Sequence, residues 1–295
     1  TTGTSNTSIG RGSMGSNTTA SNNTAVGKDA LASNATGIQC TVVGYEAGKE
    51  STAGYVTAIG WQAAKNVTSG QAIVAVGDGS LNGVTSNSHC VAVGHFSLNV
   101  ATGAYNTACG SNAGRSMTTG DKNTAVGYYA LKECTTGIEN VIIGAQAGDT
   151  ITTGSNNVCI GYNAEPASAT TNTSVTLGNS QINSLRCNDT SISGLSDSRD
   201  KTEVVALPAG LSFLNSLRPV KFKWQTRDGN GKDGTIRAGF LAQELQEAQK
   251  DYDYLDLVLE DNPDRLEAKY GNLIPAMVQA IKELSAKNEA LEARI

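Results

Sequence analysis

A glycine recurs through the first 180 residues of the chain at a spacing of only 16 or 17 residues. The residue before it is apolar every time, and the residue three before it is Thr or Val. This alternation is typical of a short β-strand that ends where the chain turns tightly or another backbone comes close. The repeat glycines are Gly10, Gly27, Gly44, Gly60, Gly77, Gly94, Gly110, Gly127, Gly144, Gly161 and Gly178. A fixed period of this length predicts a solenoid in which each repeat forms one coil.

Other positions repeat in step with the glycine. A Ser/Thr-Gly pair stands seven residues before it in most repeats, and Ala or Ser often stands three residues after it. Asparagine stands four residues before it in six repeats, at Asn6, Asn23, Asn106, Asn123, Asn140 and Asn157. We therefore predict a mainly β fold: a parallel β-roll of about eleven coils over residues 1–180, with Asn and Thr side chains aligned in ladders.

The interior of such a coil is thin. Burying one Val or Ile per coil returns far less free energy than ordering about seventeen residues costs. We therefore expect a second buried surface, formed with other copies of the chain, and predict a homotrimer. The small residues two before and three after the repeat glycine, such as Ala25 and Ala30, would allow the copies to approach closely.

Charge and glycine content change near residue 196. Only 18 of the 49 charged side chains lie before it, but 27 of the 33 glycines do. We predict a repeat domain over 1–180, a connector over 181–195 and a smaller α+β domain over 196–295. The net charge of −5 argues against a nucleic-acid partner, and the lack of a run of about 18 apolar residues argues against membrane insertion.

Candidate chemical groups are scarce in the repeats. The six cysteines form no C-x-x-C pair and fall at five different repeat offsets, which favours small buried side chains over disulfides or metal ligands. His89, Cys90 and His95 are close in sequence, but the ladders would scatter them, so we predict no metal and no cofactor. Acidic residues show no repeated pair spacing, which disfavours a glycosidase. Aromatic residues such as Trp61 and Tyr128 fit sugar stacking and packing between coils or chains equally well.

The run Asn-Thr-Ala-Val-Gly-Tyr-Tyr-Ala-Leu occupies residues 123–131 and has relatives at 23–31 and 157–164. It resembles the head repeats of trimeric autotransporter adhesins, which also occur in phage tail fibres. The resemblance covers about 180 residues. It implies a trimeric, left-handed parallel β-roll that serves adhesion or reach, and it implies no catalysis by the repeats.

The last hundred residues alternate between short helical and strand patterns. Residues 204–217 contain apolar positions at helical spacing, 219–224 alternate like a strand, and 235–240 would form its hairpin partner. The turn between these two strands is expected at 228–231. A short helix is expected over 241–250.

From about residue 272 to 295, apolar side chains repeat at heptad spacing. The predicted seam residues are Ile274, Met277, Ile281, Leu284, Asn288, Leu291 and Ile295. A lone Asn in the seam lowers stability and fixes register, and Pro275 falls in the first turn, where proline is tolerated. We predict a short parallel coiled coil that matches the trimer upstream. The alternative is an amphipathic helix packed on its own domain.

Five sequence blocks follow one another in the last hundred residues: Ser196-Asp197 with Lys201, then 217–224, 239–244, 270–275 and 280–284. This ordered set resembles the endosialidase-type intramolecular chaperone, a self-cleaving serine peptidase domain at the C-terminus of phage tail spikes and fibres. The resemblance implies a domain that trimerises, templates folding of the upstream β-structure and then cuts itself off. It assigns Ser196 as nucleophile, Lys201 as general base and Leu195–Ser196 as the scissile bond, with Asp197 in a possible supporting role.

The implied chemistry is consistent with the residue types. A serine hydroxyl becomes a good nucleophile when a base takes its proton, and a lysine can be that base once burial lowers its pKa. Lys201 would be buried only after folding and trimerisation, so cleavage would report correct assembly. Any enzymatic activity would be a single-turnover self-proteolysis without an external substrate.

These observations favour the distal segment of a phage tail fibre or spike, located on the virion. Its expected partners are two further copies of the chain, other tail proteins and a host-surface receptor, for which a glycan is the favoured class. The alternative is a trimeric adhesin on a bacterial surface, and a polysaccharide-degrading tailspike is less well supported. The chain opens in mid-repeat, so we expect an upstream virion-attachment region or secretion signal to separate the first two.

Overall fold

The computed structural model divides into two compact units, Thr1–Asn179 and Ser180–Ile295. The residues that it describes are 2–83, 85–86, 88–182, 184–188, 194–226 and 232–294. The turn expected at 228–231 and the last predicted seam residue, Ile295, lie outside the described residues.

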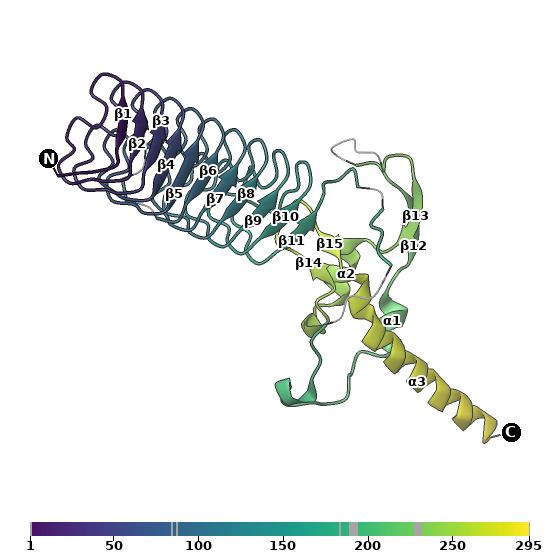
Figure 1. Cartoon of the computed structure of the whole chain (residues 1–295). Coiled ribbons are helices and arrows are strands. Elements are labelled where there is room, and N and C mark those ends of the chain that lie inside the picture. Colours follow the sequence, from purple (N-terminus) through teal and green to yellow (C-terminus); the bar gives the residue numbers. More distant parts are fainter. Residues whose placement is uncertain are drawn as a thin grey trace. The chain divides into compact units, whose positions relative to one another are not determined.

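The first unit is a parallel β-solenoid in which each coil contributes one short strand (Figure 1). The strands are β1 (Thr7–Ile9), β2 (Thr24–Val26), β3 (Thr41–Val43), β4 (Val56–Ile59), β5 (Ile73–Val76), β6 (Val91–Val93), β7 (Thr107–Cys109), β8 (Thr124–Val126), β9 (Val141–Ile143), β10 (Val158–Ile160) and β11 (Val175–Leu177). Strands that are neighbours in sequence are neighbours in the sheet, and they pair in parallel at equivalent repeat positions, as Thr107 does with Thr124. The predicted fold class, a mainly β parallel solenoid followed by a small α+β region, is confirmed.

Each repeat glycine follows its strand for two structural reasons. From Gly10 to Gly161 the φ angles of these glycines lie between 121° and 142°, where residues with a side chain are strained. In addition, a Cβ atom on Gly44 would lie 2.2 Å from the carbonyl oxygen of Gly60 in the next coil. The tight turn and the close approach of the next backbone therefore both exclude a side chain.

The interior of the solenoid is lined by the inward-facing residue of each strand from β2 to β10. These nearly fully buried residues are Ala25, Val42, Ala58, Ala75, Ala92, Ala108, Ala125, Ile142 and Cys159. The small residues three after the repeat glycine, such as Ala30 and Ala47, are also fully buried. We expected these two sets of small residues to face other copies of the chain, and that prediction is wrong. They fill the narrow space inside the coil, which close packing leaves mainly for small side chains.

The apolar residue before the repeat glycine consequently points outward, because successive residues of a strand face opposite sides. Ile143 and Ile160 are 40% and 41% exposed, and Leu177 is 52% exposed. Several of the largest buried side chains instead stand four residues after the glycine, namely Leu31, Leu81, Leu98 and Leu131. One face of the sheet therefore carries a column of apolar side chains that the single chain leaves in contact with solvent.

The predicted asparagine ladder runs through the interior. The Asn140 side-chain amide donates to the carbonyl oxygen of Gly154 (2.9 Å) and to Oδ1 of Asn123 (3.0 Å), while its Oδ1 accepts from the backbone N–H of Asn157 (3.0 Å). Cys40 and Cys90 take the asparagine position in two other coils, where each Sγ lies 3.4–3.5 Å from a backbone carbonyl oxygen. The ladder satisfies backbone groups that would otherwise be buried without a partner.

The second unit is a small α+β arrangement. Its main elements are α1 (Leu211–Ser216), β12 (Val220–Lys223), β13 (Ile236–Gly239), α2 (Ala242–Ala248), β14 (Val258–Leu259), β15 (Glu267–Ala268) and α3 (Ile274–Glu292). Strands β12 and β13 are antiparallel, as are β14 and β15. A compact apolar core holds the unit together, with Phe213 of α1, Leu245 of α2 and Leu273 before α3 among its members.

Helix α3 packs on its own unit through one face only. Ala276 and Ala280 are buried, and α1 packs against this helix. The described seam residues point elsewhere: Ile274 is 60% exposed, Ile281 is 65% exposed, and Met277, Leu284, Asn288 and Leu291 are also exposed. Packing on the unit itself therefore accounts for the alanine face and leaves the apolar seam uncovered.

Candidate functional site

The predicted cleavage site lies on an exposed segment that precedes α1. All side chains from residue 194 to 206 are exposed, and we call this stretch the arm. Leu195 is fully exposed, and Val204 and Val205 are 79% and 84% exposed. The chain becomes buried again only at Ala209. The arm thus presents apolar side chains, as well as the predicted catalytic pair, to solvent.

The structure brings Ser196 and Lys201 into direct contact. The Lys201 ammonium group donates a hydrogen bond of 2.6 Å to Oγ of Ser196 and lies 3.5 Å from the Ser196 carbonyl oxygen. A single 3₁₀ turn, η1 (Ser198–Asp200), reverses the chain between the two residues. This turn explains why a separation of five residues in sequence suffices to place the predicted nucleophile and base within hydrogen-bonding reach.

Asp197 shapes this turn. Its carboxylate accepts a hydrogen bond of 2.9 Å from the backbone N–H of Arg199, which caps η1, and forms an ion pair of 2.6 Å with the Arg199 guanidinium. The side-chain hydrogen bond from Arg199 lowers the pKa of Asp197 below its usual value. The supporting role predicted for Asp197 therefore fits an indirect contribution, in which it holds the backbone that joins Ser196 to Lys201.

The pair is assembled in the single chain but is not shielded from water, because both Ser196 and Lys201 are exposed. Burial is what lowers the pKa of a lysine far enough for it to act as a base near neutral pH. General-base catalysis by Lys201 therefore requires a further surface that covers the arm.

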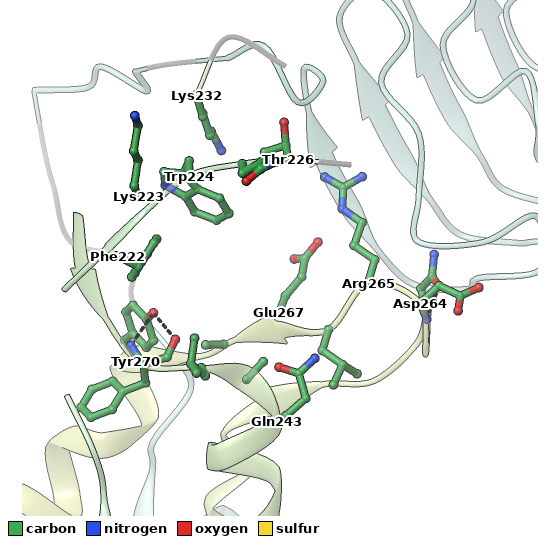
Figure 2. Close-up of a pocket in the computed structure, with 17 residues that line it drawn as sticks. Phe222, Lys223, Trp224, Thr226, Lys232, Gln243, Asp264, Arg265, Glu267 and Tyr270 are labelled. Carbon is green, nitrogen blue, oxygen red and sulfur yellow. Dashed lines mark hydrogen bonds between the residues drawn. The ribbon is translucent and has the colours of Figure 1, made fainter. Parts of the chain in front are cut away.

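A separate groove lies in the same unit and encloses about 1060 Å³ (Figure 2). Phe222, Trp224 and Tyr270 line one side of it, and Arg265 and Glu267 line another. The groove collects residues from three of the five sequence blocks that carry the chaperone resemblance, those at 217–224, 239–244 and 270–275. Their sequence separation gave no sign that they converge. Because neither residue of the Ser196–Lys201 pair lines the groove, it is distinct from the predicted cleavage site.

The two histidines of the solenoid pack against aromatic rings, and the Cys134 thiol is buried. His89 stacks on Tyr105, with ring centroids 5.1 Å apart, and His95 lies 4.1 Å from the Phe96 ring. Among the residues that the structure describes, no three His, Cys, Asp or Glu side chains are grouped as a metal ion would require. Burial raises the pKa of Cys134 to about 11, which makes this thiol unreactive near neutral pH.

Several exposed aromatic residues of the solenoid pack against one another. Tyr45 and Trp61 occupy the same position in successive coils and stack with their ring centroids 6.4 Å apart. The Lys28 ammonium group lies 4.7 Å from the centroid of the Tyr45 ring. Packing between coils therefore accounts for this pair. Within the described parts of the chain, no helix combines the length and the apolar character needed to cross a membrane.

Comparison with known protein families bears on the unit that contains the Ser196–Lys201 pair. Residues 196–254 match the family model described as "Chaperone of endosialidase". The match begins at the serine of the pair. Searches of curated proteins and of solved structures gave no match. The C-terminal region therefore carries a chaperone-of-endosialidase domain over residues 196–254, preceded by a parallel β-solenoid. The match confirms the resemblance inferred from the first three sequence blocks, and the blocks at 270–275 and 280–284 lie beyond it.

Proposed function

We propose that this chain is the distal segment of a trimeric phage tail fibre or spike, and that its C-terminal domain drives trimerisation and folding and then cleaves the Leu195–Ser196 bond. One observation carries the proposal: the Lys201 ammonium group lies 2.6 Å from Ser196 Oγ at the first residue of the matched chaperone domain. A hydroxyl and a lysine at this distance can act as nucleophile and base once the lysine has lost its proton.

The cleavage step follows from the position of the nucleophile next to the scissile bond. Ser196 Oγ attacks the carbonyl carbon of Leu195 through a five-membered ring, while its proton passes to neutral Lys201. The C–N bond then breaks, the Ser196 nitrogen takes the proton back from Lys201, and an ester joins Leu195 to Ser196 Oγ. Water hydrolyses this ester to a Leu195 carboxylate and a free Ser196 hydroxyl. Each chain reacts once because the scissile bond is its own.

The uncovered apolar surfaces of the single chain support the trimer. In α3 the seam residues Ile281 and Leu284 are 65% and 48% exposed, which suits a partner helix at each heptad position. In the solenoid, the outward-facing column that includes Ile143 and Ile160 forms a second exposed apolar stripe, which runs along the sheet. A continuous apolar stripe of this kind is typical of an interaction surface.

A removable C-terminal template is useful to such a fibre. Parallel solenoids in which several chains must come into register fold slowly. Pairing between distant segments costs chain entropy before the burial of apolar surface stabilises the structure. A compact trimeric domain at one end raises the local concentration of the chains and sets their register. Its later removal leaves a product that is held by a kinetic barrier to unfolding.

The proposal is tested by expressing the chain beside Ser196→Ala and Lys201→Ala variants and running all three on a denaturing gel. The unmodified chain should give fragments of roughly two-thirds and one-third of its length, whereas each variant should give a single full-length band. Lys250→Ala, which removes an exposed lysine paired with Glu247, is the matched control and should cleave normally. Identical patterns for all four proteins would end the proposal.

We further propose that the solenoid attaches the virion to a host-surface receptor, with a glycan as the favoured class. A bacterial trimeric adhesin with the same chaperone is the runner-up. Incubating the fibre with host polysaccharide tests the remaining alternative, since new reducing ends would indicate a hydrolase and retention without them a binder.

A further inference from the structure

One carboxylate connects helix α3 to the start of α1, where the exposed arm gives way to the buried core of the second unit. Oε2 of Glu283 accepts a hydrogen bond of 2.9 Å from the backbone N–H of Leu211, and Oε1 accepts one of 3.0 Å from the side-chain amide of Gln279. Leu211 is the first residue of α1, and its N-cap, Gly210, contributes no capping side chain. The carboxylate of a distant helix therefore does the work that a local capping residue ordinarily does.

The absence of a side chain at Gly210 leaves room for the Glu283 carboxylate. A Cβ atom at this position would lie 2.0 Å from Oε1 of Glu283 and 2.5 Å from its Cδ. The φ angle of Gly210 is −121°, which any residue can adopt, so a side chain here would conflict with the Glu283 carboxylate and would displace it from Leu211. Ala209, directly before it, is fully buried, whereas the arm ends at the exposed residue 206. The Glu283 contact thus lies at the root of the arm.

On α3, the same side chain stands at the border between the buried and the uncovered face. Ala280, three residues earlier, is 4% exposed and packs on the unit. Leu284, the next residue, is 48% exposed and belongs to the predicted seam. A change in the orientation of α3 on assembly would therefore reach the root of the arm through Glu283 as well as through the packing of α1 on α3.

We infer that Glu283 is a positioning residue for self-cleavage, because it fixes the root of the arm that carries Ser196 and Lys201 to the helix that assembles with other copies. This inference rests on the proposed function. Assembly of α3 then sets the direction in which the arm leaves the unit and brings the pair against the surface that covers it. A misplacement of about 1 Å can slow a reaction about 100-fold, so loss of the contact should slow cleavage about 10- to 100-fold.

The first test compares Glu283→Ala with Glu289→Ala in the full chain. Glu289 is an exposed glutamate on the same helix whose side chain makes only a 3.5 Å contact with Ser285 Oγ, which makes it a matched control. Light scattering reports the trimer, and a denaturing gel over time reports the cleavage rate. Glu283→Ala should remain trimeric and cleave about 10- to 100-fold more slowly, while Glu289→Ala cleaves at the normal rate. Equal rates for the two variants would overturn the inference.

A double variant separates positioning from simple helix capping. Glu283→Ala/Gly210→Ser gives α1 a local serine cap that does not reach α3, and the removal of the carboxylate leaves space for the new side chain. Thermal stability should then recover relative to Glu283→Ala, while cleavage stays slow. Recovery of both would show that Glu283 only caps α1. This variant also keeps the test open if the single variant assembles poorly.

A final measurement does not depend on cleavage. In the Ser196→Ala background, amide hydrogen exchange of residues 197–206 is measured in the trimer with and without Glu283→Ala, and with Glu289→Ala as control. Glu283→Ala should raise exchange in the arm, and the control should not. If the unmodified chain fails to cleave, the proposed function falls, but unchanged exchange in the arm is what would overturn the role of Glu283.

Discussion

At the scale of single residues, Lys201 donates a hydrogen bond to Ser196, and its proposed role as general base requires it also to lose its proton. Lys201→Arg separates these two properties, because a guanidinium still donates hydrogen bonds but keeps its proton at any accessible pH. The variant should therefore leave the chain uncleaved, seen as a full-length band on a denaturing gel. Lys250→Arg, at an exposed lysine paired with Glu247, should cleave like the unmodified chain. Normal cleavage by Lys201→Arg would contradict the role of Lys201 as base.

Glu46 provides a residue-scale test of acid sensitivity in the solenoid. An ion pair of 2.7 Å with Lys65 and a hydrogen bond of 2.9 Å from Gln62 lower its pKa from 4.5 to about 2. Because the pKa is lower in the folded state, ionised Glu46 stabilises the fold above pH 4.5, and this contribution is lost as the pH falls from 4.5 towards 2.

Glu46→Gln should therefore reduce the free energy of unfolding at pH 7 by about 1–2 kcal/mol, an amount discounted for the partial exposure of Lys65. It should also flatten the fall in stability between pH 4.5 and pH 2. Thermal midpoints measured across this range check both effects. Parallel pH profiles for the variant and the unmodified chain would show that Glu46 does not carry the dependence.

At the scale of the coil, the asparagine ladder should be a major source of stability. Asn140→Ala removes the partners of the Asn157 N–H and the Gly154 carbonyl and leaves a cavity at a fully buried site. A loss of about 2–4 kcal/mol is expected, seen as a lower thermal midpoint of the solenoid. Asn140→Cys should cost less, because Cys40 and Cys90 already fill this position in other coils. Equal losses for Ala and Cys would argue against the ladder as the source.

At the scale of the helix, the uncovered seam of α3 should decide assembly. Ile281→Asp places a charge at a seam position that is 65% exposed in the single chain, so it should leave the unit folded and abolish the trimer. Ala286→Asp changes an exposed residue on the opposite side of the predicted seam and should leave the trimer intact. Light scattering gives the oligomeric state, and loss of cleavage should accompany loss of the trimer. A trimeric, normally cleaving Ile281→Asp variant would refute the predicted coiled coil.

Elements of the fold were predictable to the extent that the sequence repeats them. Eleven copies of one pattern located the strands, the glycine turns and the asparagine ladder. A period of two shows which residues share a face but not which face is inside, so Ala125 was assigned to the outside and the half-exposed Val126 to the interior.

Among the site residues, contacts between near neighbours in sequence were predictable, and contacts between distant residues were not. Ser196 and Lys201 are five positions apart with one 3₁₀ turn between them, so their contact follows from local sequence. The bond between Leu211 and Glu283 joins residues 72 apart, and no spacing rule shows it. The surface that the proposed cleavage requires over the arm is absent from the described single chain, because the chain exposes both members of the pair.

At the scale of the whole molecule, cleavage should turn reversible folding into one-way folding. The uncleaved Ser196→Ala trimer keeps its template, whereas the cleaved fibre has lost it. Both should resist unfolding to a similar extent, because the solenoid that must open is the same. After denaturation in guanidinium and dilution, however, only the uncleaved trimer should recover, since the cleaved chains must find their register without a local concentration of ends. Light scattering and circular dichroism measure this recovery.

The released domain, added back as a separate molecule, should not restore the recovery of the cleaved fibre. Equal recovery of cleaved and uncleaved protein would show that the solenoid sets its own register and that the C-terminal domain serves another purpose.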